Sequence, residues 1–270
     1  AGRLSFYDNT MHMRSIDRWR MEGELREALD QEQLQMHFQP IVHFPDGTPA
    51  GFEALIRWVH PSRGFISPAD FIPIAEQAGM ICAIGDLALR QSCAALAVYR
   101  EKFPQLDLFM SVNFSPLQLD ETGFLSTVQS LLKDCEIPAA SLKLEITETA
   151  MASEADKMKE LLAELHAIGV KLSLDDFGTG YSSMAYLDSF PISTLKIDRS
   201  FVAEVDGDAA KKEIVGAILL LAQSLNLDVI GEGIETKSQR QVLEQMGCKF
   251  GQGWLFSKAL PPDQIPAWID

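Results

Sequence analysis

Basic residues are scarce in this sequence. Its 23 lysines and arginines stand against 38 aspartates and glutamates, which gives the 270-residue chain a net charge of −15. Proteins that bind DNA or RNA polymers neutralise the phosphates with lysine and arginine, so the composition excludes a nucleic-acid polymer as the partner. A small phosphate-containing ligand stays compatible with this charge, provided that metal ions supply positive charge locally.

Cysteine and histidine are also sparse. The four cysteines form no Cys-x-x-Cys pair and lie among apolar residues; they are Cys82, Cys93, Cys135 and Cys248. This pattern excludes a disulfide framework and predicts buried thiols in a reducing compartment. The five histidines are scattered along the chain. Neither residue type therefore offers the clustered ligands that a zinc site requires.

Long apolar segments are absent as well. The longest apolar stretch, residues 214–222, is much shorter than a membrane-spanning helix. The N-terminus lacks the charged-then-apolar pattern of a signal peptide. We therefore expect a cytoplasmic chain. If the chain belongs to a longer protein, that full-length protein could still be anchored in a membrane.

Strand patterns alternate with helix patterns along most of the chain. Strands are predicted at residues 35–42, 50–58, 106–113, 141–147, 171–175, 192–197, 227–231 and 249–253. Helices are predicted from residue 67 to about 100 and at residues 116–135, 153–168, 208–225, 236–246 and 262–268. Such alternation predicts parallel βα units, and seven or eight units favour an α/β fold of the TIM-like (β/α)8 barrel type. The alternative fold is an open, doubly wound sheet.

Polar residues fall at the carboxyl ends of the predicted strands. The residues at these ends are Asn113, Glu145, Asp175, Lys196, Glu232 and Gln252. In a barrel the carboxyl ends of the strands converge on one mouth, where functional residues gather. In an open sheet they would be spread along an edge, and only those near the switch point would share a cleft. The distribution favours the barrel.

One stretch carries two adjacent carboxylates. The preceding leucines alternate at strand period, so Asp175 and Asp176 should end a strand with their side chains on opposite sides. Neighbouring aspartates repel one another unless a cation lies beside them, and a divalent metal ion meets that need. Glycines at positions 178 and 180 favour a loop that closes over a ligand. The alternative is a strand-to-helix turn in which an aspartate caps the next helix.

The predicted mouth holds many oxygen ligands and one cation. The acidic and amide residues there are Glu53, Asn113, Glu145, Asp175, Asp176 and Glu232, and the cation is Lys196. Oxygen ligands in this number suit Mg²⁺ or Mn²⁺ rather than zinc. Two such ions about 4 Å apart, bridged by a shared carboxylate, are a common device for activating water against a phosphodiester. Asp175 is placed to be that bridge.

The motifs, taken in order, resemble one bacterial family. Glu53-Ala-Leu55, followed by Arg57, is similar to the signature after which EAL domains, the cyclic di-GMP phosphodiesterases, are named. Further similar segments are Phe38-Gln-Pro-Ile41, Val112-Asn113, Leu144-Glu-Ile-Thr-Glu148, residues 175–183, Lys196-Ile-Asp198-Arg-Ser-Phe201, Gly231-Glu-Gly-Ile-Glu235 and Gly251-Gln-Gly253. The resemblance covers residues 20–268. It implies a metal-dependent barrel enzyme that opens cyclic di-GMP to linear pGpG in bacterial second-messenger signalling.

The resemblance also implies roles for individual residues. The ligands of a first metal ion would be Glu53, Asn113, Glu145 and Asp175, and those of a second would be Asp175, Asp176 and Glu232. The catalytic group would be Lys196, which holds the attacking water, Glu232 as candidate general base, and Gln252 near the metal site. The substrate contacts would be Gln39, Arg57, Asp198 and Glu235. The cofactor would be two Mg²⁺ or Mn²⁺ ions, with Ca²⁺ inhibitory. Trp254 would either flank a guanine or pack at the barrel rim.

Two further segments bear on regulation. Glu148 is similar to the residue that anchors the loop at residues 177–183, which in the family links the metal site to a dimer interface. We therefore expect a homodimer, with Thr179 or Ser182 donating hydrogen bonds to Glu148. Residues 14–29 predict an amphipathic linker helix. Together with Phe6-Tyr-Asp8 and Met11, this helix resembles the junction that follows a diguanylate cyclase (GGDEF) domain. This implies a linker remnant at residues 1–19, an EAL barrel at residues 20–270, and covalently linked GGDEF or sensory domains upstream.

Two functions from different classes follow from these features. The first is a phosphodiesterase that cleaves cyclic di-GMP. The alternative is a catalytically weak receptor that binds the dinucleotide without cleaving it. Degenerate members of the family lose metal carboxylates or the lysine, and this sequence keeps all of them, which favours the enzyme. An unrelated barrel hydrolase would require every motif to match by coincidence.

Overall fold

The computed structural model describes residues 9–120, 123–153, 155–179, 187 and 189–270. The chain forms two compact units, Ala1–Gln35 with Ile56–Ile84, and Met36–Leu55 with Gly85–Asp270. Strand β2 (Pro49–His60) and helix α3 (Ile81–Lys102) each continue from one unit into the other. The boundary between a linker at residues 1–19 and a barrel at residues 20–270 stays a prediction.

The larger unit is built around a closed barrel of eight strands. In pairing order these are β1 (Leu34–His43), β9 (Phe250–Gln252), β8 (Asp228–Gly231), β7 (Thr194–Ile197), β6 (Lys171–Phe177), β5 (Leu142–Thr147), β4 (Phe109–Asn113) and β2. Because β1 also pairs with β2, the sheet closes on itself. Around the barrel from β2 through β4, β5, β6, β7 and β8 to β9, neighbouring strands pair in parallel. The predicted (β/α)8 barrel is confirmed, and the open-sheet alternative is wrong.

Strand β1 is the exception to the parallel order. It pairs antiparallel with β9, with Ile41 opposite Gln252. A tight turn leads from β1 into β2: the Thr48 backbone N–H donates to the Asp46 carboxylate at 3.0 Å, and Gly47 has a φ of +71°. A connection this short cannot make the long crossover that parallel strands need, so β1 runs against its neighbours.

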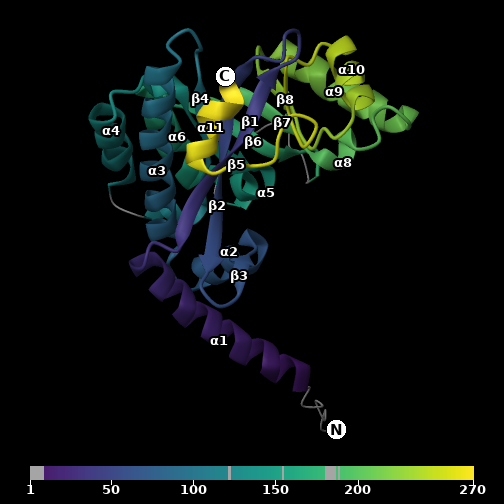
Figure 1. Cartoon of the computed structure of the whole chain (residues 1–270). Helices are drawn as coiled ribbons and strands as arrows, with labels where there is room; N and C mark the ends of the chain where they lie inside the picture. Colours follow the sequence, from purple (N-terminus) through teal and green to yellow (C-terminus); the bar gives the residue numbers. More distant parts are fainter. Residues whose placement is uncertain (1–8, 121–122, 154, 180–186, 188) are drawn as a thin grey trace. The chain divides into compact units, whose positions relative to one another are not determined.

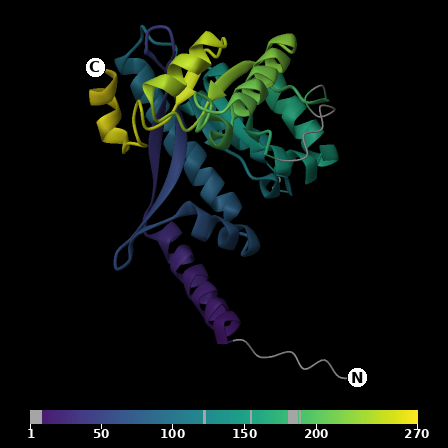
Figure 2. The same cartoon turned by 90° about the vertical axis from the view of Figure 1, so that its right-hand side faces the viewer.

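Helices surround these strands. They are α3, α4 (Phe124–Asp134), α5 (Glu148–Ser153), α6 (Ala155–Ala167), α8 (Arg199–Val202), α9 (Ala209–Ser224), α10 (Lys237–Gln245) and α11 (Ile265–Ile269). Short 3-10 turns lie at Pro116–Asp120 (η1), Ala139–Ser141 (η2) and Pro262–Gln264 (η3). Figure 1 shows α4 and α6 on one side of the strands and α9 and α10 on the other, and Figure 2 shows the latter pair from their own side.

Two predicted helices have different bounds in the structure. The helix predicted at residues 116–135 is wrong as a single element, because η1 and α4 are separated by Gly123, whose φ of +109° is incompatible with a continuous helix. The helix predicted at residues 153–168 begins earlier, as α5 directly after β5, and continues as α6. Among the described helices, α3 alone is long and apolar enough to cross a membrane by length and composition, and 44% of its apolar window is buried.

Polar side chains line the inside of the barrel. Ser111 on β4, Ser173 on β6 and Thr194 on β7 have no exposed surface. The Lys143 Nζ donates to the Thr194 hydroxyl at 3.1 Å and lies 3.9 Å from the centroid of the Phe109 ring. Since β5 and β7 are not neighbours, this bond crosses the interior, and burial lowers the pKa of Lys143 to about 8. Side chains alternate between the two faces of a strand. The residue two positions after each of these polar residues therefore also points into the barrel, nearer its carboxyl end.

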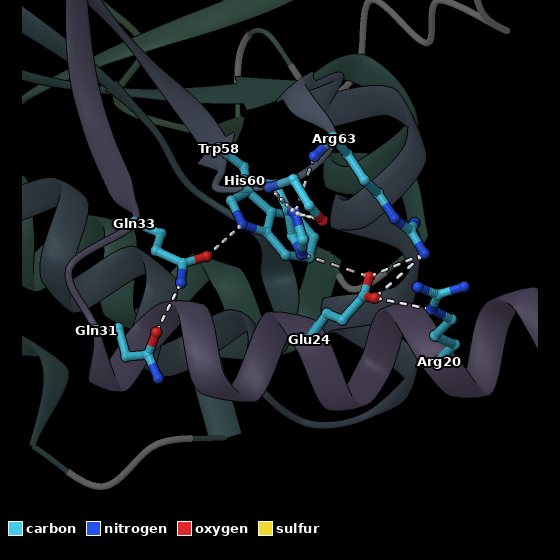
Figure 3. Close-up of polar contacts among 8 residues, drawn as sticks. Arg20, Glu24, Gln31, Gln33, Trp58, His60 and Arg63 are labelled. Atoms are coloured by element: carbon cyan, nitrogen blue, oxygen red, sulfur yellow. Dashed lines mark hydrogen bonds and ion pairs between the residues drawn. The ribbon is translucent and has the colours of Figure 1, made fainter.

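The smaller unit joins helix α1 (Asn9–Asp30) to the end of β2 and to β3 (Gly64–Ile66) through a polar cluster. Glu24 on α1 accepts from the Arg20 Nε at 2.9 Å and from the Arg63 Nη2 at 3.2 Å, and its carboxylate lies 3.8 Å from the His60 Nε2 (Figure 3). The indole N–H of Trp58 donates to the Gln33 side chain at 3.3 Å. Charge and hydrogen bonding thus tie α1 to the hairpin.

Helix α1 confirms that these residues are helical but not the predicted apolar face, and the role of the helix as a linker stays a prediction. Leu25 and Ala28 are fully buried, whereas Trp19 is 79% exposed. The next helix, α2 (Pro68–Gln77), begins at Ser67, whose side chain accepts from the Ala69 backbone N–H. Such a cap satisfies a donor that the first turn of a helix leaves free.

Candidate active site

Lys196 lies at the centre of the polar cluster inside the carboxyl end of the barrel. Its Nζ is 2.7 Å from the Glu232 Oε1, 2.8 Å from the Glu145 Oε2, 3.3 Å from the Asp175 Oδ1 and 3.5 Å from the Glu53 Oε2. The lysine has no exposed surface. The four carboxylates come from four different strands or strand ends, so the closed barrel is what brings them together.

The positive and negative charges of this cluster do not balance. Burial works to lower the pKa of Lys196, but the four carboxylates raise it well above its ordinary value, so the amine stays charged. Burial raises the pKa of Glu145 to about 8 in spite of the attraction of Lys196, and burial also raises the pKa of Glu232 well above its usual range. One ammonium group therefore does not balance four carboxylates, and the cluster favours additional positive charge.

Glu53 is held by amides as well as by the lysine. Burial opposes its ionisation, but the charge of Lys196 and hydrogen bonds from Gln252 and Asn113 lower its pKa overall. The Gln252 Nε2 donates to the Glu53 Oε2 at 2.5 Å and to the Gln39 Oε1 at 3.1 Å, and the Asn113 Nδ2 donates to the Glu53 Oε1 at 3.2 Å. The sequence prediction that these residues meet at one mouth is confirmed by these contacts.

Asp175, Asp176 and Glu232 each present an oxygen atom within 4.8 Å of the other two. The prediction that the two aspartates point to opposite sides is wrong. Asp176 has a φ of +54°, and the pairing of β6 with β7 shifts register between Leu174 and Phe177. This left-handed residue breaks the strand alternation, so both carboxylates reach the same point.

The donor set fits a hard divalent cation. Every candidate ligand offers oxygen, as Mg²⁺ and Mn²⁺ prefer. One buried carboxylate oxygen, the Glu145 Oε1, has no hydrogen-bond donor among the described residues, and the Asp175 Oδ1 has only the ion pair with Lys196 at 3.3 Å. Burial, followed by the charge of Asp175, raises the pKa of Asp176. Unsatisfied oxygens and mutually repelling acids are what a bound cation would relieve.

A cavity of about 730 Å³ opens beside these acids. Its walls include three of the predicted substrate contacts, Gln39, Asp198 and Glu235, together with Trp254. The Trp254 side chain is 64% exposed, which argues against the alternative that it is packed at the barrel rim. Ligand cavities of about 300–1,000 Å³ hold small molecules, so this one has room for a nucleotide-sized ligand.

Arg57, the fourth predicted substrate contact, belongs to the smaller unit. Its Nη1 donates to the Ile56 carbonyl at 3.0 Å, and its guanidinium lies 5.8 Å from the centroid of the Phe65 ring. Its role toward a substrate stays a prediction.

Glu148 holds the start of the loop that follows β6. Its Oε2 accepts from the Gly178 backbone N–H at 3.1 Å, which supports its expected role as a loop anchor. The expectation that Thr179 donates to Glu148 is wrong, because the Thr179 hydroxyl donates instead to the Asp176 carbonyl at 2.8 Å. The other expected donor, Ser182, lies outside the described residues.

Arg199 and Ser200 also line the cavity, although the sequence analysis gave them no role. They begin α8, a helix of four residues capped by Asp198, whose carboxylate accepts from the Ser200 backbone N–H at 3.0 Å. So short a helix gives no periodic signal in the sequence. Their position directly after the carboxyl end of β7 was the available clue.

Comparison with known proteins decides the family. The EAL domain model matches residues 22–259. The chain belongs to the EAL domain family. This match spans every candidate site residue from Gln39 to Gln252, so the polar cluster around Lys196 lies wholly within the EAL domain.

Two curated relatives and two solved structures illustrate the similarity of this EAL domain. The bifunctional diguanylate cyclase/cyclic di-GMP phosphodiesterase MucR of Pseudomonas aeruginosa is 38% identical over 264 residues, which cover 98% of this chain and 38% of MucR. The cyclic di-GMP phosphodiesterase NbdA of the same organism is 40% identical over 256 residues, covering 95% of this chain and 33% of NbdA. The EAL domain thus spans about a third of the length of these relatives.

The solved structures agree in fold. The PaMucR phosphodiesterase in complex with c-di-GMP is 39% identical, with a TM-score of 0.86 and coverage of 91% of this chain and 99% of that one. The EAL enzyme Bd1971 in its cAMP- and cyclic-di-GMP-bound form is 34% identical, with a TM-score of 0.90 and coverage of 95% of this chain and 70% of that one.

Proposed function

We propose that this EAL domain hydrolyses cyclic di-GMP at one phosphodiester to linear pGpG, with two Mg²⁺ or Mn²⁺ ions as cofactors. The observation that carries the proposal is the buried set of four carboxylates around Lys196, with Asp176 brought beside Asp175 and Glu232 at the wall of a large cavity. Two relatives are named as cyclic di-GMP phosphodiesterases, and one similar solved structure is a c-di-GMP complex. These similarities support the substrate class.

The residues divide into metal ligands and substrate contacts. Glu53, Asn113, Glu145 and Asp175 would hold one ion, and Asp175, Asp176 and Glu232 the other. When bound, these ions would polarise the scissile phosphodiester and make a water molecule more acidic. Gln39, Asp198 and Glu235 line the cavity, where their amide and carboxylate groups can hydrogen-bond the edges of the bases.

Glu232 is placed to take a proton from the attacking water. Its Oε1 is 2.7 Å from the Lys196 Nζ, which leaves its other oxygen to accept the proton. The water oxygen attacks phosphorus, the bond from phosphorus to the 3′ oxygen breaks, and the departing oxygen takes up a proton. The product then carries a 5′ phosphate and a 3′ hydroxyl. Lys196 holds the carboxylates in place during these steps by its contacts with all four.

The test is incubation with cyclic di-GMP and Mg²⁺ or Mn²⁺, with the products separated by chromatography. We expect pGpG from the wild type and a loss of turnover of at least about a hundredfold in Asp175→Asn, because the shared ligand loses its charge. Asp134→Asn, at the exposed end of α4, is the matched control and should retain full activity. Ca²⁺ should inhibit, because its bonds of about 2.3–2.6 Å exceed the 2.0–2.1 Å of Mg²⁺ and misplace the reacting groups.

The same experiment separates the enzyme from a receptor. Tight binding of cyclic di-GMP without any product, with both Mg²⁺ and Mn²⁺, would refute the hydrolase and favour the binding module. We further propose that the protein is a cytoplasmic homodimer with linked upstream domains. The relatives are about three times longer than the matched segment, which supports linked domains. Light scattering of the chain and of its full-length protein tests that assembly.

A further inference from the structure

The walls of the cavity are strongly acidic. Six of the described residues that line it carry carboxylates: Glu53, Asp175, Asp176, Asp198, Glu232 and Glu235. Among the described lining residues only Arg199 is basic. Lys196 adds no free positive charge, because it has no exposed surface and lies within 3.5 Å of four carboxylates. A ligand that carries negative charge meets one protein cation in this cavity.

A cyclic dinucleotide carries two phosphodiesters, each with one negative charge, on opposite sides of its ring. Metal ions at the acid cluster would neutralise only the phosphodiester that lies against them. The second phosphodiester faces a wall of carboxylates unless another cation meets it, since like charges at close range in a partly desolvated site are unfavourable. The ligand of the proposed function therefore calls for a cation on the cavity wall away from the acid cluster.

We propose that Arg199 binds the second phosphodiester, the one that is not cleaved, and so selects dinucleotides over ligands with a single phosphate. This inference rests on the proposed cyclic di-GMP substrate. A guanidinium group suits this task because its planar fork of N–H donors matches two oxygens of a phosphate at once. Arg199 is exposed at the start of α8, so its side chain can reach a ligand in the cavity.

The base of the arginine side chain is held by close packing. Gly233 has a φ of +65°, and a Cβ added there would lie 2.4 Å from the Arg199 Cβ and 3.3 Å from its Cα. Only a glycine permits the loop after Glu232 to approach α8 this closely. The first atoms of the arginine side chain are thus fixed against the loop, which reduces the entropy lost when the guanidinium binds a ligand.

Gln239 keeps that loop in place. Its side-chain oxygen accepts from the backbone N–H groups of Glu235 at 2.8 Å and Thr236 at 3.0 Å, and its Nε2 donates to the Ala203 carbonyl at 2.9 Å. The side chain is buried, so these bonds are protected from water. They join the loop at residues 232–236 to Ala203, the residue directly after α8. Arg199 and Glu235 are therefore positioned together on the cavity wall.

The experiment compares substrates with two phosphates and with one. Arg199→Ala, Arg199→Lys and wild type are assayed on cyclic di-GMP and on bis(p-nitrophenyl) phosphate, which has a single phosphodiester. Loss of one charge-assisted contact at an exposed residue corresponds to a rise of about tenfold in KM for cyclic di-GMP. We expect kcat on cyclic di-GMP, and all constants on the single-phosphate substrate, to stay unchanged, with partial recovery of KM in Arg199→Lys.

Arg90→Ala is the matched control. Arg90 is an exposed arginine on α3 that does not line the cavity, and its loss changes the net charge by the same amount. It should leave KM for cyclic di-GMP unchanged. If Arg90→Ala and Arg199→Ala raise KM equally, long-range charge explains the effect and the assignment of Arg199 is overturned. An equal loss on both substrates would also overturn it, because Arg199 would then act on folding or on the reaction itself.

A binding measurement separates failure of this inference from failure of the proposed function. The Kd for cyclic di-GMP is measured in Ca²⁺, where we expect no turnover, for wild type and Arg199→Ala. Binding without hydrolysis in Mg²⁺ would refute the phosphodiesterase, yet a tenfold weaker Kd in Arg199→Ala would still support the phosphate contact. Hydrolysis with an unchanged KM and Kd in the variant would refute the contact alone. If wild type does not bind the dinucleotide at all, both proposals fall.

Discussion

Lys196→Met tests whether one buried ammonium group holds the site together. Methionine keeps the length of the lysine stem and removes only the charge, so packing changes little. Removing one partner of a buried ion pair typically costs about 3–5 kcal/mol, because the remaining charge is left uncompensated. Lys196 has two carboxylates within 2.8 Å and two more within 3.5 Å, so we expect a loss in unfolding free energy at the upper end of that range.

The size of this loss should depend on pH. In the wild type the charge of Lys196 helps to hold the pKa of Glu53 below its ordinary value, so removing the lysine leaves burial to raise that pKa. At low pH the carboxyl groups of the variant take up protons and become neutral, which limits the loss. As pH rises, the wild type keeps Glu53 ionised in both the folded and the unfolded state, whereas the folded variant retains a proton that its unfolded chain has released, so the loss grows.

The assay is urea unfolding of wild type and Lys196→Met in EDTA at pH 6 and pH 8, repeated with Mg²⁺. We expect the difference between the two proteins to be larger at pH 8, and Mg²⁺ to stabilise the variant by binding to the folded state. Arg90→Met serves as a control on an exposed surface, where a charge contributes less than about 1 kcal/mol. A difference below about 1 kcal/mol for Lys196→Met at pH 8 would refute the argument from burial.

Two further predictions concern the loop anchor and the titration of the wild type. Glu148→Ala removes the acceptor of the Gly178 N–H, and we expect about 1–3 kcal/mol less stability, lower activity and a weaker dimer. If wild type and Glu148→Ala show equal specific activity at every protein concentration and equal mass by light scattering, the loop does not link activity to dimer formation. In EDTA, burial of Glu145 raises its pKa from 4.5 to about 8, so the folded protein holds more protons than the unfolded chain, and stability should fall as pH rises between these values. Melting curves from pH 5 to 8 check this; an equal slope in Glu145→Gln would exclude Glu145 as the cause.

The sequence predicted the site best where a residue's position follows from strand alternation and barrel topology. Glu145, Asp175 and Lys196 each lie at or near the carboxyl end of a parallel strand, and closure of the barrel then forces them together. The contacts between individual residues did not have to be known in advance, because the barrel fold fixes where the strand ends meet. The antiparallel start of the barrel was also implicit in the tight turn at Gly47, which is too short for a parallel crossover.

Prediction failed where a single backbone angle or a short element decides the outcome. Period-two alternation places Asp175 and Asp176 on opposite faces, and only the φ of +54° at Asp176 reverses this. The four-residue helix α8 is too short to show a hydrophobic period, so Arg199 was overlooked. Glu148 was recognised, but its donor is the Gly178 backbone, which no side-chain pattern can indicate.

The arrangement of charges suggests why the site would use a lysine as well as the proposed metal ions. Lys196 and Glu145 lie within the barrel and do not line the cavity, whereas Asp175, Asp176 and Glu232 do. The lysine therefore offsets the repulsion among the carboxylates from the inner side, and this contribution is present as soon as the barrel closes. The proposed divalent ions would approach from the cavity side, where Asp175, Asp176 and Glu232 line the wall. Folding would then not require metal, and metal affinity would be set by acids that the lysine has already brought together.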